Sequence, residues 1–82
     1  MKTYNITVFT ENNIGILNRI TIIFTRRHVN IESITASDSE EDGIYRYTIV
    51  IKTAESQVIK IVNQIEKLVD VIKAFYYKNK EV

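Results

Sequence analysis

The residues best suited to bind a small charged molecule lie in one short stretch, Glu11 to Leu17, which reads ENNIGIL. Apolar residues stop at Glu11, two asparagines follow, and apolar residues at helical spacing resume at Leu17. Gly15 has no Cβ atom, so a ligand can approach the backbone where the unpaired N–H groups of a helix emerge. Because a helix N-terminus carries about half a positive charge, this stretch suits a carboxylate or a phosphate.

The two asparagines of this stretch also have a simpler explanation. Asn side chains bond to the backbone in turns and cap helices. On this ground alone, Asn12 and Asn13 are better explained as turn formers than as residues that contact a ligand.

The remaining reactive side chains favour no catalytic or metal site. There is no Cys, and His28 is the only histidine, which excludes a thiolate nucleophile and leaves no convincing Ser–His pair. Four carboxylates lie between Asp38 and Asp42, but they lack the interleaved spacing of a calcium loop and are typical of a solvated hairpin turn. An acylphosphatase-like site would need an Arg and a Gly-rich phosphate cradle after the first strand. We expect no catalysis by this chain.

Length and composition are those of one small globular domain. The chain has 82 residues, of which 45% are hydrophobic and 26% charged. Its net charge of +1 gives no reason to expect a nucleic-acid partner. No apolar run approaches the ~18 residues of a membrane span, and Met1 to Asn5 lacks the apolar core of a secretion signal. We expect a cytoplasmic protein that does not bind membranes.

Hydrophobic periodicity predicts six elements in the order β-α-β-β-α-β. They are strands at residues 4–10, 29–37, 44–53 and 69–77, a helix at 15–28, and a second helix from Ser56, its expected N-cap, through Leu68. This order is typical of an α+β, ferredoxin-like fold, with a four-stranded antiparallel sheet of order 4-1-3-2 and two helices on one face. The expected buried residues are Leu17, Ile20, Phe24, Ile49, Ile61, Ile65 and Leu68.

Two surfaces of such a fold would lie open in this chain. The sheet face away from the helices would carry Thr7, Phe9, Thr48 and Val50, which is too apolar for a face left in water. The strand at residues 29–37 would be an unprotected edge. We therefore expect the chain to associate with itself, either edge to edge or face to face.

Three blocks of sequence resemble a known family. The stretch ENNIGIL is similar to the start of an ACT domain, a small amino-acid-sensing module. Val29 to Thr35, VNIESIT, and Ile65 to Val71, IEKLVDV, resemble one branch of it, the small regulatory subunit of acetohydroxyacid synthase, also called acetolactate synthase. The resemblance covers about residues 4–76 and departs at Ile14, where many ACT domains have Pro. It implies an ACT domain over residues 1–77, with 78–82 a polar tail or the start of a missing C-terminal region.

The resemblance also implies a function. The small subunit joins a large catalytic subunit that uses thiamine diphosphate, magnesium and FAD, and it raises the activity of that subunit. It also imposes feedback inhibition by a branched-chain amino acid, most often valine. None of these cofactors is expected to bind to this chain. The effector-binding residues carried over are Asn12, Gly15, Ile16, Leu17, Asn30 and Ile31.

Helix geometry adds a constraint to this site. A helix of about 13 residues separates Gly15 from Asn30 by roughly 20 Å, so one chain cannot bring both to one small ligand. Two chains that pair through the strand at residues 29–37 across a twofold axis can do so. We therefore expect a homodimer with two equivalent effector sites in its interface.

Two alternatives stay open. The chain could be another amino-acid-sensing ACT regulator. It could also be an RNA-recognition module, in which Tyr4, Tyr45 and Tyr47 would stack on bases. The tyrosines share the alternation phase of Ile49 and Ile51, which predicts that they face the core instead.

Overall fold

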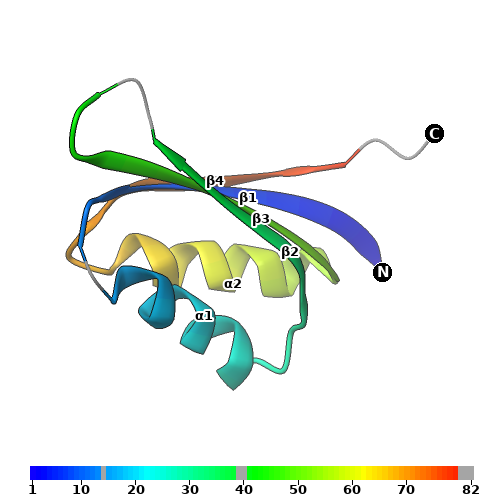
Figure 1. The fold of residues 1–82 in the computed structure, drawn as a ribbon. Helices are drawn as coiled ribbons and strands as arrows, with labels where there is room; N and C mark the ends of the chain where they lie inside the picture. Colours follow the sequence, from blue (N-terminus) through cyan, green and yellow to red (C-terminus); the bar gives the residue numbers. More distant parts are fainter. Residues whose placement is uncertain (14, 39–40, 80–82) are drawn as a thin grey trace.

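The computed structural model describes residues 1–13, 15–38 and 41–79. Its elements are β1 (Lys2–Glu11), α1 (Ile16–Arg26), β2 (Ile31–Asp38), β3 (Ile44–Thr53), α2 (Glu55–Glu66) and β4 (Val71–Lys78). The four strands form one antiparallel sheet in the order β2-β3-β1-β4, with both helices on the same face (Figure 1). The ferredoxin-like fold expected from the sequence is confirmed.

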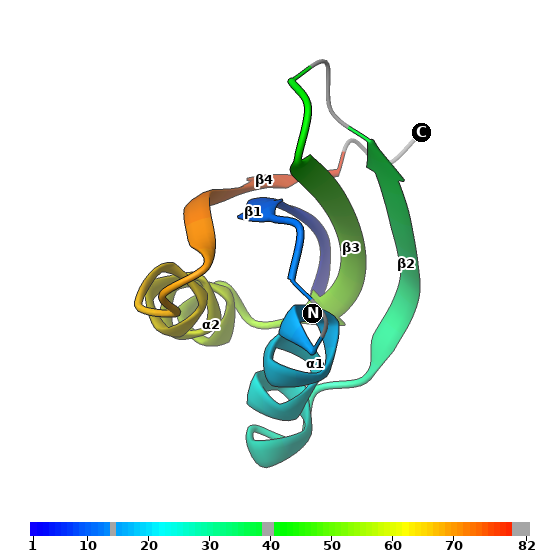
Figure 2. The same ribbon diagram turned by 60° about the vertical axis from the view of Figure 1, so that its left-hand side comes forward.

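The core lies between the sheet and the two helices. Alternate residues of the central strands point into it, with Ile6 and Val8 from β1 and Ile49 and Ile51 from β3 fully buried. Seen from a second direction, α2 lies on the β4 side of the sheet and α1 lies toward β2 (Figure 2). Within the described residues, β2 is an edge strand that pairs with β3 alone, and most of its residues are exposed.

Helix α1 buries an apolar stripe close to the expected one, but without Leu17. Its buried residues are Ile16, Ile20, Ile23 and Phe24, which follow the spacing i, i+4, i+7 and i+8. Leu17 is 40% exposed, so its predicted burial is wrong. Because successive helical residues are rotated by about 100° around the axis, Leu17 lies at the margin of a stripe that begins at Ile16. Of the other residues expected in the core, Leu68 is only partly buried, and Ile20, Phe24, Ile49, Ile61 and Ile65 are confirmed as buried.

The C-terminus of α1 comes earlier than predicted, at Arg26. His28 adopts a left-handed conformation with a φ of 57°. Its N–H donates to the carbonyl of Thr25, and the N–H of Val29 donates to the carbonyl of Phe24. These two bonds form a Schellman motif, which ends the helix and turns the chain into β2.

Helix α2 begins directly after Ala54, and no side chain caps it. The expected N-cap at Ser56 is therefore wrong, because Ser56 lies inside the first turn. Glu55 instead accepts a hydrogen bond of 3.0 Å from the Tyr76 hydroxyl. This bond, helped by burial, raises the pKa of Tyr76 and links the start of α2 to β4.

Some expectations fall outside the described residues. These are the departure from Pro at Ile14, the middle of the acidic turn at residues 39–40, and the last part of the polar tail at 80–82. The division into residues 1–77 and 78–82 stays a prediction. Neither helix of the described chain is long and apolar enough to cross a membrane.

The corrected stripe of α1 gives a stability test. Ile20→Ala should lower the free energy of unfolding by about 2 to 5 kcal/mol, because it leaves a cavity at a fully buried position. Leu17→Ala removes a side chain of the same size from the margin of the same helix and should cost less than about 1 kcal/mol. Urea unfolding of both variants measures the difference, and equal losses would contradict the burial pattern.

Candidate functional site

The predicted binding stretch forms the turn between β1 and α1, and two other loops hold it in place. The N–H of Glu11 donates to the carbonyl of Asp70 at 2.9 Å, in the connection from α2 to β4. The N–H of Asn12 donates to the carbonyl of Gly43 at 2.8 Å, in the hairpin between β2 and β3. Three loops thus meet at one end of the domain, where Figure 1 shows them together.

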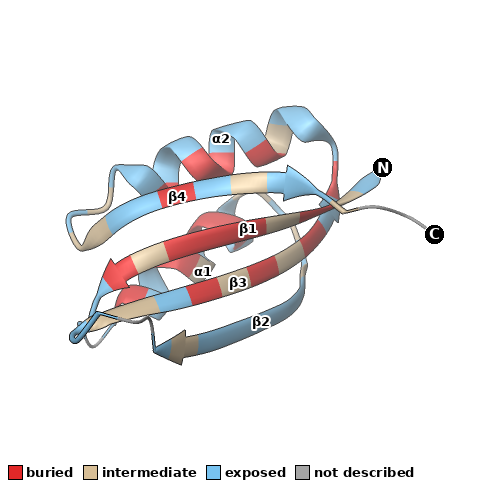
Figure 3. Ribbon diagram, turned by 90° about the horizontal axis from the view of Figure 1, so that it is seen from above, coloured by how far each residue is buried: buried red, intermediate tan, exposed pale blue. Residues whose placement is uncertain are grey.

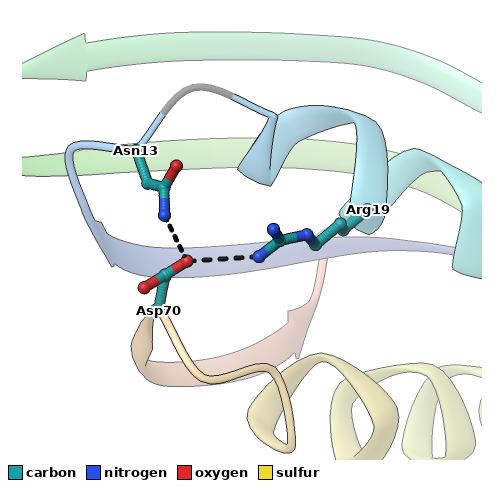
Figure 4. Close-up of polar contacts among 3 residues, drawn as sticks. All are labelled: Asn13, Arg19 and Asp70. Atoms are coloured by element: carbon teal, nitrogen blue, oxygen red, sulfur yellow. Dashed lines mark hydrogen bonds and ion pairs between the residues drawn. The ribbon is translucent and has the colours of Figure 1, made fainter.

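A carboxylate fastens the turn to its neighbours. The side-chain nitrogen of Asn13, Nδ2, donates to Asp70 Oδ2 at 2.6 Å, and Arg19 Nη1 lies 3.2 Å from the same oxygen (Figure 4). The side chain of Asp70 is only 15% exposed, so this charge-assisted contact is partly shielded from water. The side chain of Asn13 therefore has a structural contact, but with the carboxylate of a distant loop and not with the backbone of its own turn.

The sequence analysis missed Asp70 and Arg19. They lie 51 residues apart, and Asp70 is 57 residues from Asn13. No local pattern in one sequence joins positions so far apart. Only the fold brings the connection before β4 against the turn before α1.

Among the described residues, no side chain makes a capping hydrogen bond to the N-terminus of α1. Gly15 is its N-cap residue and has a φ of 96° and a ψ of −10°, a left-handed conformation that favours glycine. No side chain caps the helix, and its first turn holds no acidic residue. The partial positive charge of this terminus is therefore not neutralised by a neighbouring side chain of α1, which suits an anionic ligand.

The predicted residues around Gly15 differ in how accessible they are. The side chain of Asn12 is exposed, and that of Leu17 is 40% exposed. Ile16 is 1% exposed and its N–H donates to the carbonyl of Asn13 at 3.3 Å. In the single chain, Ile16 therefore serves mainly to seat the helix on the core.

The other half of the predicted site lies at the far end of α1. Asn30 is exposed directly before β2, and Ile31 is partly buried against the core. The eleven residues of α1 span about 16 Å, so Gly15 before the helix and Asn30 after it are well separated. In Figure 1, the start of α1 and the start of β2 lie at opposite ends of the helix. One chain does not bring the predicted residues together.

Other kinds of site find less support. Tyr4 and Tyr47 are 4% and 6% exposed, and Tyr45 packs partly buried against the core. The three tyrosines considered as a base-stacking platform are thus not on the open sheet face. Among residues 1–13, 15–38 and 41–79, no three His, Asp or Glu side chains gather where they could hold a metal ion.

The fold and the Asn–Gly turn at the first helix define an ACT domain. Residues 6–73 match the family model described as the AHAS small subunit-like ACT domain. The chain belongs to this family of ACT domains, found in the small subunit of acetolactate synthase, as the sequence resemblance indicated.

Curated relatives agree with this assignment. The acetolactate synthase small subunit of Bacillus subtilis is 41% identical over 94% of this chain and 45% of its own length. The probable acetolactate synthase small subunit of Methanothermobacter thermautotrophicus is 42% identical over 87% of this chain and 42% of its own length. The chain thus spans less than half the length of these relatives.

Solved structures give the same picture. The acetolactate synthase small subunit from Thermotoga maritima superposes with a TM-score of 0.83 and 30% identity, over 93% of this chain and 47% of that one. The ACT domain from the GTP pyrophosphokinase of Chlorobium tepidum has a TM-score of 0.75 over 93% of this chain and 97% of that one. At 18% identity, this second likeness shows the fold alone.

The contact at Asp70 predicts a measurable loss of stability. Asp70→Ala should lower the free energy of unfolding by about 1 to 2 kcal/mol, because Asn13 and Arg19 lose their charged acceptor. Asp42→Ala, at an exposed position of the hairpin, is the matched control and should change it by less than about 0.5 kcal/mol. Thermal and urea unfolding test both, and an unchanged Asp70→Ala variant would show that the backbone bonds alone hold the turn.

Proposed function

We propose that this chain is a non-catalytic regulatory subunit of acetolactate synthase that binds a branched-chain amino acid, with valine as the expected effector. It acts in the cytoplasm, where it raises the activity of the large catalytic subunit and transmits inhibition by the end product. Thiamine diphosphate, magnesium and FAD belong to the catalytic subunit, and none of them binds here.

The observation that carries this proposal is the uncapped N-terminus of α1. A free amino acid has a carboxylate that matches the partial positive charge at Gly15, and the left-handed glycine keeps the approach to the backbone open. The side-chain amide of Asn12 can reach the carboxylate or the ammonium group. Leu17, which is 40% exposed, offers apolar surface to an aliphatic side chain.

We further propose that the site is completed by a second chain. Tyr45 of β3 pairs with Thr10 of β1 on one side and with Asp38 of β2 on the other, so the end of β2 lies level with the turn. If two β2 strands pair antiparallel, the start of the partner's β2, with its Asn30 and Ile31, comes to this end of the sheet. The edge of β2 is mostly exposed and has no other strand beside it in the described chain, which leaves it free for this pairing.

A site shared between chains couples binding to assembly. An amino acid that contacts both protomers stabilises the pair relative to the separate chains. The catalytic subunit then meets a regulatory dimer whose stability and interface depend on the effector concentration, which gives inhibition a physical route.

Gly15→Asp tests where the effector carboxylate sits. The variant places a negative charge at the proposed carboxylate position, which at about 4 Å and an effective dielectric near 20 costs on the order of 4 kcal/mol, or roughly a thousandfold in affinity. Inhibition of the enzyme reconstituted with this variant should be lost at the valine concentration that inhibits the wild type. Much of the activation of the catalytic subunit should remain.

Gly15→Asn is the matched control, because it has the same size and the same strain at a positive φ but no charge. It should fold as Gly15→Asp does and keep clearly more of the inhibition. Titration calorimetry with valine, leucine and isoleucine reports binding independently of the catalytic subunit. A folded Gly15→Asp chain that binds or responds like the wild type would place the effector elsewhere.

A further inference from the structure

The sheet face away from the helices is open. Figure 3 looks onto this face, while α1 and α2 lie behind the sheet. The side chains on the opposite side of the strands from the core form this face. On β1, β3 and β4 its apolar and hydroxyl members are Thr7, which is itself buried, and Phe9, Thr48, Val50, Phe75 and Tyr77. Phe75 and Tyr77 are 41% and 50% exposed. A contiguous surface of this kind on a small domain is typical of an interaction site.

Charged side chains on the open face are arranged in rows across the strands. The row nearest the three loops is acidic on β1, where Glu11 pairs with Ile44 at the start of β3. The next row is basic, because Arg46 and Lys73 lie on either side of Phe9 in the strand register. Lys73 Nζ lies 5.1 Å from the centre of the Phe9 ring.

The rest of the open face is neutral until its far end. The middle row holds Thr7, Thr48 and Phe75, and Tyr77 comes in the following row beside Asn5. The last row holds Lys52, which pairs with Thr3 at the start of β1. Along the strands the face therefore runs from acidic to basic, through a neutral middle, to basic again.

This charge pattern selects one way for two copies to meet. If equivalent rows met, Glu11 would oppose the Glu11 of the other copy, and the pair Arg46 and Lys73 would oppose its own copy, which is unfavourable. If the strands of the two copies run in opposite directions, Glu11 lies over the row of Lys52. Arg46 and Lys73 then lie over the row of Tyr77, where a cation can pack on the aromatic ring.

The size of the face sets a condition for this contact. Eight residues along a strand and four strands across give about 500 Å² per copy, or roughly 1,000 Å² for two, which is below a standard interface. Two sheets joined through β2 would double this to roughly 2,000 Å². The face contact should therefore be weak between single chains and stable between edge-joined dimers.

We infer that a second copy of this chain covers the open sheet face, with its strands antiparallel to those of the first, and that edge dimers pair through this face into assemblies of four chains. The inference rests on the proposed edge dimer for the size of the buried interface. It rests on the charge rows for the relative direction of the strands in the two copies. The two sheets pack about 10 Å apart with their strands within about 30° of each other.

Sedimentation equilibrium of the full chain tests the contact. The wild type should reach four copies at high concentration, and Phe75→Lys should stop at two. Ile59→Lys puts the same charge at a position of similar exposure, 43%, on the outer side of α2 and should stay at four. Circular dichroism checks that each variant is folded. If Phe75→Lys does not fold, Tyr77→Lys takes its place in the test. A folded face variant with the wild-type mass would overturn the inference.

A charge exchange tests the direction. Lys52→Glu should weaken the four-chain state at least tenfold, because it would face Glu11 of the other copy. The double variant Lys52→Glu with Glu11→Lys should regain much of the loss. Lys60→Glu, on the exposed side of α2, is the control and should have no effect. A double variant that assembles no better than Lys52→Glu alone would overturn the antiparallel arrangement.

Proline variants of β2 separate this inference from the edge dimer. Successive N–H groups of an edge strand point alternately toward the sheet and away from it, so of Ile34→Pro and Thr35→Pro the more stable variant marks the outward donor. If the wild type reaches only two copies, the more stable proline variant and Phe75→Lys together show whether the two copies are joined through the β2 edge or through the open face. If only the proline variant becomes monomeric, the edge dimer stands and the face inference is overturned. If only Phe75→Lys does, the face contact stands and the edge dimer fails.

Discussion

The arrangement of this end of the domain depends on how the turn before α1 is held. Asp70 accepts from Asn13 and Arg19 through its side chain and from Glu11 through its backbone, while Gly43 accepts from Asn12. Through these bonds the turn is held by two other loops as well as by its own residues. They also leave Gly15 in a left-handed conformation with an open approach to the helix N-terminus. Rigid support around an uncapped helix end is what preorganised binding of an anion requires.

The same geometry explains why one chain holds only part of a site. Helix α1 must be long enough to cover the sheet, and this length separates Gly15 from Asn30. β2 is an edge strand of the described sheet, and the dimer that we propose would bring the residues missing from one chain through this edge. In the shared site that we propose, an effector bound between two chains would couple its own binding to assembly.

Much of the fold could be predicted from the sequence, because alternation in β1 and β3 and the apolar stripes of two helices leave few arrangements. The stripe of α1 was misplaced at Leu17, since several sets of apolar residues fit a helical period and only packing against the sheet selects one. The caps were less predictable, because His28 takes a left-handed conformation usual for glycine, and Ala54 precedes α2 without a capping side chain. Asp70 was not predictable, because its contacts with Asn13 and Arg19 exist only in the folded chain.

The most direct test of the shared site mixes two defective chains. Gly15→Asp damages the turn, and Asn30→Ala removes an amide that should contribute about 1 to 3 kcal/mol to effector binding. In a mixed dimer of the two variants, one site would carry both changes and the other would carry neither. Random mixing at equal amounts should therefore restore wild-type valine affinity at about a quarter of all sites, as measured by titration calorimetry. A mixture that binds no better than the average of the two variants would contradict a site built from both chains.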